Sequence, residues 1–166
     1  DTGTLLHFDG SNWSTISLGY TNNLYGIWGT SANDIFVTGG SGLILHYDGA
    51  TWSAMTSGTL YALRGVWGFS STDVFATGAA GVILRYDGAT WSEMTSGVIS
   101  TINDIWGADA THVFAVGSTG TLLNFNGVTW NKMTSPTTSG FLDVWGVASN
   151  NVFAAGESGA VIHYDG

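Results

Sequence analysis

One stretch of this sequence occurs twice in nearly the same form, 39 residues apart. Residues 42–58 read GLILHYDGATWSAMTSG, and residues 81–97 read GVILRYDGATWSEMTSG. The same interval separates glycines, phenylalanines and tryptophans along the whole chain. A fixed period of this length is typical of solenoids and propellers, in which a unit buries its apolar faces only against neighbouring units.

The repeat accounts for all eight tryptophans of the sequence, two in each unit. One row is Trp13, Trp52, Trp91 and Trp130, and the other is Trp28, Trp67, Trp106 and Trp145. Both rows suit packing between units, where a large ring buries much apolar area. Full units cover residues 3–41, 42–80, 81–119 and 120–158, and residues 159–166 open a fifth. We predict one domain over residues 1–166.

Each unit contains four short segments that favour β-strands. In residues 62–97 these are LRGVWG, DVFATG, VILRY and TWSEM, and Asp-Gly between the last two is a strong hairpin signal. No apolar period of 3.6 residues persists long enough for a helix. The sequence therefore predicts an all-β fold, a β-propeller of four-stranded antiparallel blades, with the four strands running from the centre outward.

The number of blades in the ring stays open. The chain contains four blade equivalents and one spare strand of the third type, since residues 3–10 and 159–166 are equivalent. One chain could close a four-bladed ring as a monomer, and two chains could form a homodimer that shares an eight-bladed ring. We favour the monomer because its closure has no association cost.

Composition excludes several classes of function. The net charge is −9 with only three lysines and arginines, so the basic surface that nucleic-acid binding needs is absent. No apolar run is long enough to span a bilayer, so we predict no membrane insertion. The chain has no cysteine and therefore no thiolate metal site. We expect no cofactor and no metal.

An acidic residue recurs at one position of the repeat: Asp9, Asp48 and Asp87, with Asn126 in the fourth unit and Asp165 in the fifth. A site for a hard cation requires the negative charge of the carboxylate, which Asn126 lacks. An Asx turn requires only the side-chain oxygen, which Asn126 keeps. We assign this row a structural role. His7, His46 and His163 share another position and lie on separate units, which does not suit a zinc site.

An enzyme is not expected. The glutamates are only Glu93 and Glu157, nearly every aspartate falls in a repeated row or a turn, and no nucleophile elbow or phosphate loop appears. We predict no catalytic residue.

The segments that join one blade to the next are the most divergent parts of the units: YTNNLYG, TLYALRG, VISTIND and TTSGFLD. They are expected to share one face with the short loops GGSG, GAAG, GSTG and GESG. Loops on a rigid frame commonly carry binding, although neutral drift gives the same divergence. The candidate ligand-binding residues in these segments are Tyr25, Tyr61, Arg64, Asn103, Asp104, Phe141 and Asp143. Asp104 and Asp143 are expected to face the central channel, where a cation could sit between them.

The pattern VWG…DVFATG…GVILRYDGATW resembles the tryptophan-rich propeller repeats of bacterial secreted and cell-envelope proteins, and is distantly similar to Asp-box and kelch propellers. The resemblance implies a propeller in an extracellular or cell-envelope location. The propeller frame, the abundant hydroxyl and amide groups, the aromatic loop residues and the few charges lead us to expect a non-enzymatic module that binds carbohydrate or a surface polymer. The alternative is a structural or protein-interaction scaffold, natural or designed, without a small-molecule ligand.

Overall fold

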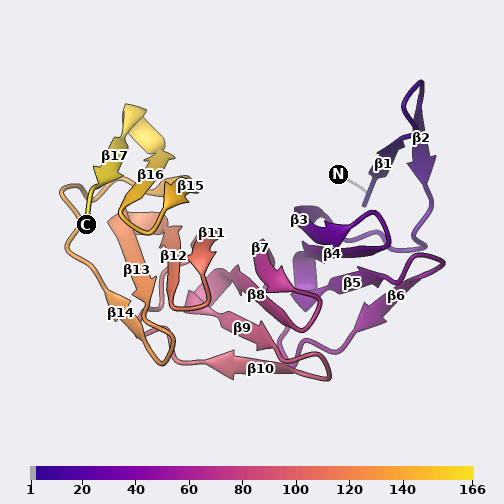
Figure 1. Ribbon diagram of the computed structural model, residues 1–166, viewed down its shortest axis with the longest axis horizontal. Helices are drawn as coiled ribbons and strands as arrows, with labels where there is room; N and C mark the ends of the chain where they lie inside the picture. The colour runs from indigo at the N-terminus through magenta and orange to yellow at the C-terminus, as the bar shows by residue number, and fades with distance from the viewer. Residues whose placement is uncertain (1–2) are drawn as a thin grey trace.

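The computed structural model describes residues 3–166, which form five antiparallel sheets. Figure 1 shows the sheets arranged in an open arc around a common centre, with the N-terminal hairpin at one end and the C-terminal sheet at the other. The first strand of each larger sheet lies nearest the centre. The chain moves outward through a blade before it starts the next.

Three of the sheets are complete blades of four strands. The first blade contains β3 (Leu24–Ser31), β4 (Asp34–Gly39), β5 (Ile44–Tyr47) and β6 (Trp52–Met55). The second contains β7 (Leu63–Ser70), β8 (Asp73–Gly78), β9 (Ile83–Tyr86) and β10 (Trp91–Met94). The third contains β11 (Ile102–Asp109), β12 (His112–Gly117), β13 (Thr121–Phe125) and β14 (Trp130–Lys132). The order within each blade follows the sequence, which confirms the predicted four-stranded units.

The two ends of the arc are incomplete blades. At the N-terminal end, β1 (Leu5–Phe8) pairs only with β2 (Trp13–Ile16). At the C-terminal end, β15 (Phe141–Ala148), β16 (Asn151–Gly156) and β17 (Val161–Tyr164) form a sheet of three strands. Among residues 3–166, β17 therefore has one edge without a neighbouring strand.

Three apolar clusters hold the four larger sheets together, one at each interface between neighbouring sheets. The first cluster joins Phe36 and Ile44 of one blade to Leu63 and Val74 of the next. The third strands are buried on both faces, as the apolar sequence predicts: Ile44 and Leu45 are both inaccessible to solvent. Burial of this apolar area between sheets is the main stabilising contribution, since no blade can supply it alone.

The predicted closure of a four-bladed ring by one chain is wrong for this structure. β2 and β17 lie at opposite ends of the arc (Figure 1) and do not pair. The interfaces between blades fix the angle from one sheet to the next, and four blade equivalents at this angle leave the ring open. Trp13 and Trp145 are consequently exposed, whereas Trp91, Trp106 and Trp130 of the same two rows are buried as predicted.

Short 3₁₀ turns connect the second and third strands of each unit, where the sequence predicts only loops. They are η1 (Gly40–Gly42), η2 (Ala79–Gly81), η3 (Ser118–Gly120) and η4 (Glu157–Gly159). In each, the central residue is a non-glycine with left-handed backbone, φ being 55–58° at Ser41, Ala80, Thr119 and Ser158. The glycine that follows also has a positive φ. Two left-handed residues in succession reverse the chain sharply.

Candidate binding face

The segments between blades, here called linkers, lie on the same face of the arc as the 3₁₀ turns. Backbone hydrogen bonds join the two in every unit: the Gly40 amide donates to the Asn23 carbonyl at 2.8 Å, and the Ala79 amide donates to the Ala62 carbonyl at 2.9 Å. Equivalent bonds occur at Ser118 and Glu157. The face predicted to carry binding is therefore a fixed frame, on which side chains can vary without altering the backbone.

Grooves recur on this face at the period of the repeat. Three of them, here called the repeat grooves, have volumes of about 480, 670 and 400 Å³ along the chain. Each is lined by the left-handed turn residue, the following glycine and the Met-Thr-Ser segment where the fourth strand ends and the linker begins. In the middle groove these are Ala80, Gly81, Met94, Thr95 and Ser96. Because the lining repeats, one extended ligand could meet similar chemistry on successive blades.

Two exposed aliphatic side chains stand at the rims of neighbouring grooves. Leu60 is 89% exposed and Ile99 is 92% exposed, and the two occupy the same position of the repeat. The equivalent positions in the other units carry Thr21 and Thr138. Neither residue is among the candidates predicted from the sequence, although both lie in the divergent linkers. The available signal was an apolar side chain at a position where the other units have a hydroxyl.

Three of the predicted site residues lie nearer the centre, where the innermost strands begin. Tyr25, Arg64 and Asn103 occupy one position of the repeat, at a break in the pairing register between the first and second strands. The Arg64 guanidinium lies over the Tyr25 ring, 5.5 Å from its centroid, which brings these two residues together across blades. The Asn103 amide donates to the Phe141 carbonyl at 2.7 Å. Tyr61 lies exposed on the linker between β6 and β7.

Asp104 and Asp143 are brought together, as their equivalent positions predict. The Val144 amide donates to Asp104 Oδ2 at 2.9 Å, which ties the two inner strands to each other. Partial burial raises the pKa of Asp104 to about 6, and the neighbouring Asp143 carboxyl adds to the rise against the opposing Val144 N–H bond. Protonation of Asp104 therefore relieves the charge repulsion between the two neighbouring carboxyl groups.

Phe141 is not a surface residue. Its side chain is fully buried in the cluster between β12 and the C-terminal sheet. The physical reason is its position in the repeat, which it shares with the equally buried Leu63 and Ile102. Phe141 therefore belongs to the core, and only its carbonyl, which accepts from Asn103, contributes to the face.

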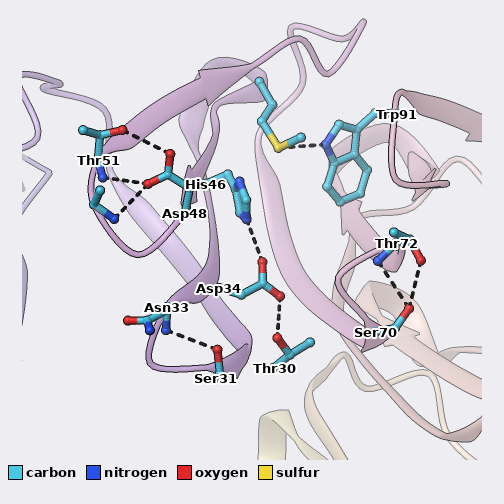
Figure 2. Close-up of polar contacts among 12 residues, drawn as sticks. Thr30, Ser31, Asn33, Asp34, His46, Asp48, Thr51, Ser70, Thr72 and Trp91 are labelled. Atoms are coloured by element: carbon cyan, nitrogen blue, oxygen red, sulfur yellow. Dashed lines mark hydrogen bonds and ion pairs between the residues drawn. The ribbon is translucent and has the colours of Figure 1, made fainter.

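The aspartate row forms the predicted Asx turns. Asp48 Oδ1 accepts from the amides of Ala50 at 2.9 Å and Thr51 at 2.8 Å (Figure 2). Asp9 and Asp87 make the same pair of bonds, and Asn126 reproduces it with its amide oxygen. These N–H donors lower the pKa of Asp9, Asp48 and Asp87.

The histidine row is also part of the frame. His46 Nε2 lies 2.7 Å from Asp34 Oδ1, and its ring stacks on Phe36 with centroids 4.4 Å apart. Thr30 donates to the other Asp34 oxygen (Figure 2). In the next blade Arg85 takes the position of His46 and makes a bidentate pair with Asp73, the equivalent of Asp34. The residue type differs, but this position pairs with the aspartate of the second strand in both blades. In residues 3–166 no group of three or more His, Cys, Asp or Glu side chains is placed to hold a metal ion.

No helix in the described part of the chain has the length and apolar character needed to cross a membrane. No family model matches the sequence, and no curated protein matches it. The resemblance to tryptophan-rich bacterial repeats therefore stays a prediction.

Solved structures match along nearly the whole chain. YCF48 from Cyanidioschyzon merolae superposes with a TM-score of 0.74 at 15% identity, over 98% of this chain and 63% of that chain. YCF48 bound to D1 peptide gives a TM-score of 0.51 at 16% identity, over 98% and 71%. An outer coat vertex of COPII on membranes gives 0.74 at 13% identity, over 99% and 54%. The chain thus spans about two thirds or less of two of these proteins. At such identities the likeness establishes the fold, which is a β-propeller arrangement of blades.

Proposed function

We propose that this chain is a non-enzymatic binding module. Its linker face, which is the face formed by the linkers and the 3₁₀ turns, holds an extended segment of another protein. The observation that carries the proposal is the set of repeat grooves, with Leu60 and Ile99 at their rims. Isolated apolar side chains are common on protein surfaces. Leu60 and Ile99, however, occupy the same repeat position beside hydroxyl-lined grooves, and together they form a periodic pattern of apolar and polar groups. Such a pattern suits the alternating side chains of an extended peptide.

Charge favours a neutral or basic segment. The chain has a net charge of −9, so its field attracts cations and slows the approach of acidic partners. Lys132 in the lining of the middle groove is the exception, and Glu93 lies in the same lining. The groove itself is therefore close to neutral, and the charge of the whole chain sets the preference.

Carbohydrate binding at each blade has less support than the sequence suggested. A ring that stacks on sugar must be accessible, but Trp91, Trp106 and Trp130 are buried between sheets. The two most exposed tryptophans, Trp13 on β2 and Trp145 on β15, belong to the sheets at opposite ends of the arc (Figure 1). A lectin with one equivalent tryptophan platform per blade would need these rings to leave the core.

The similar structures are consistent with a protein ligand, since one of them is YCF48 bound to a peptide. The Asp104–Asp143 pair does not by itself favour an enzyme, because Asp104 is already engaged by the Val144 amide. The extracellular or cell-envelope location stays a prediction from the resemblance.

Selection of peptides from a random displayed library, followed by calorimetric titration, tests this function. We expect Leu60→Glu and Ile99→Glu to weaken binding of a selected peptide at least tenfold. Val128→Glu is the matched control, because Val128 is also an exposed aliphatic residue but lies in the turn between β13 and β14. Failure to select any peptide, or equal loss with Val128→Glu, would contradict the proposal.

A further inference from the structure

The two ends of the arc expose rows of side chains that the internal blades bury. At the C-terminal end, Trp145 is 58% exposed, although its equivalent Trp106 is 6% exposed. Phe153 and Val161 on the same sheet are likewise exposed. At the N-terminal end, Ile27 is 60% exposed, whereas its equivalent Val66 is 7% exposed. Each end thus presents half of an interface between blades.

The two half-interfaces are complementary, because the internal blades show how they fit. The Trp106 ring lies over Gly146 of the next sheet, so closely that a Cβ on Gly146 would come within 2.7 Å of it. Trp28 lies over Gly68 in the same way. By the same repeat, Trp145 should lie over a glycine at the position of Gly29. In this structure Gly29 is exposed and has no tryptophan against it.

A second complementary feature lies beside the free edge of β17. An apolar slot of about 130 Å³ opens there, with Phe114, Met133 and Tyr164 in its lining. The equivalent space of the first interface is filled by Trp91 from the outermost strand. Its Nε1–H donates to Met55 Sδ at 3.4 Å, and its ring lies 6.3 Å from Phe36 and 5.2 Å from Tyr86. Those three residues are the repeat equivalents of Met133, Phe114 and Tyr164.

Trp13 is the most exposed member of this tryptophan row. It lies on β2, is 68% exposed and contacts the Phe8 ring at 5.3 Å. Its equivalent Trp130 is 8% exposed and contacts both Phe75 and Phe125. The chain therefore carries an unfilled slot at one end and an unburied tryptophan of matching kind at the other.

We propose that a second copy of this chain joins the two ends. In this arrangement β2 of one copy becomes the fourth strand of the β15–β16–β17 sheet of the other copy, and its Trp13 fills the slot. Trp145 then packs over Gly29 of the other copy. The two copies make these contacts reciprocally, so that both ends of each arc are covered and no end remains open.

The equivalence of β17 and β1 explains how the strand exchange can occur. Residues 160–166 read AVIHYDG and residues 4–10 read TLLHFDG, and β2 pairs antiparallel with β1 in the present structure. β17 can take the place of β1 in the same register, which sets Trp13 opposite Tyr164 and Ser14 opposite His163. The exchange is favourable because β17 arrives with β15 and β16 behind it, whereas β1 supports β2 alone.

The number of copies follows from the repeat. Each chain supplies four blade equivalents, and the open arc shows that four do not close a ring. Propellers typically have four to eight blades, so two copies reach the upper end of that range and three copies exceed it.

Light scattering coupled to size exclusion gives the first test on the unmodified chain. We expect a mass of twice the 17.4 kDa of one chain. Ile27→Glu and Trp145→Ala should each shift the protein towards the mass of one chain. Ile99→Glu, an equally apolar exposed position away from the ends, should leave the mass unchanged. A mass of one chain, or of three, for the unmodified protein would overturn the proposal.

Disulfide trapping tests the pairing itself, since the natural chain has no cysteine. Separately prepared Ser14→Cys and His163→Cys proteins are mixed, exchanged and oxidised, and we expect a covalent product of twice the chain mass that contains one of each. Thr15→Cys in place of Ser14→Cys is the control, because neighbouring residues of a strand point to opposite faces. Equal yields from the control, or no mixed product, would refute the proposed register. Neither test involves a peptide, so their outcome is independent of the proposed function.

Discussion

Gly81 and Gly97 offer a matched pair of substitutions that tests how the binding face is built. Both glycines have left-handed backbone, with φ of +74° at Gly81 and +75° at Gly97. A Cβ on Gly97 would meet no atom within 4 Å, whereas a Cβ on Gly81 would lie 2.0 Å from the Val98 carbonyl oxygen. Gly97→Ala therefore measures the backbone conformation alone, and Gly81→Ala adds the contact between turn and linker.

The expected magnitudes follow from these two contributions. The left-handed conformation destabilises the folded state by about 1–2 kcal/mol when the residue is not glycine. Replacing glycine also reduces the conformational freedom of the unfolded chain, which stabilises the protein by about 0.4–1 kcal/mol. Gly97→Ala should then lower the free energy of unfolding by about 1 kcal/mol. Gly81→Ala should cost about 1–3 kcal/mol more, because overpacking must displace the Val98 backbone. That displacement also disturbs the bond from Ser96 Oγ to the Val98 carbonyl, which is 3.3 Å long.

Urea unfolding followed by tryptophan fluorescence measures both variants, with the free energy of unfolding taken by linear extrapolation at comparable slopes. The loss at Gly81 should exceed the loss at Gly97 by at least about 1 kcal/mol. Equal losses would refute the reasoning, because they would mean that the turn can move away from the linker. The face would then be a set of mobile loops and not a fixed frame.

Two further predictions concern carboxyl groups. Asp104 has a pKa of about 6 in the folded chain, against 3.8 for an unperturbed group. Ionisation of Asp104 therefore opposes folding. As the pH rises from 4 to beyond 6, the unmodified protein should lose up to roughly 3 kcal/mol of its free energy of unfolding from this group. Asp104→Asn should remove that loss, so urea midpoints at pH 4 and pH 8 should differ less than in the unmodified chain, and an unchanged difference would contradict the assignment. Asp87→Ala should lower the thermal midpoint because two amide donors lose their acceptor, whereas Asp87→Asn should stay near the unmodified value, as Asn126 makes the same turn. Similar losses from both substitutions would instead assign the effect to the charge.

The sequence predicts the blades well because each strand repeats under the same local constraints. The Asp-Gly turn after β9 and the doubly apolar pattern of Ile83 and Leu84 recur in other units, and the structure has them as expected. Closure of the ring depends instead on the angle between neighbouring sheets. That angle results from the packing of whole interfaces, such as Trp106 over Gly146, and no single residue type encodes it.

The positions of several candidate residues follow from the repeat for a similar reason. Arg64 lies over Tyr25, and Asp104 accepts from the Val144 amide, because equivalent positions of neighbouring units lie side by side at the start of the inner strands. The prediction that Phe141 is a ligand-binding residue is wrong, because its repeat position, which it shares with Leu63 and Ile102, belongs to the core. Leu60 and Ile99 were overlooked because their grooves arise from turn and strand residues of separate segments.

Hydrogen exchange of the chain with and without a selected peptide tests the central claim most directly, namely that the linker face holds a protein segment. We predict slower amide exchange in residues 56–61 and 95–100, which line or border the repeat grooves, and no change in the turn at residues 126–129 on the other side of the blade. Protection confined to the turn at residues 126–129, or to β2 and β17 at the ends of the arc, would contradict the account.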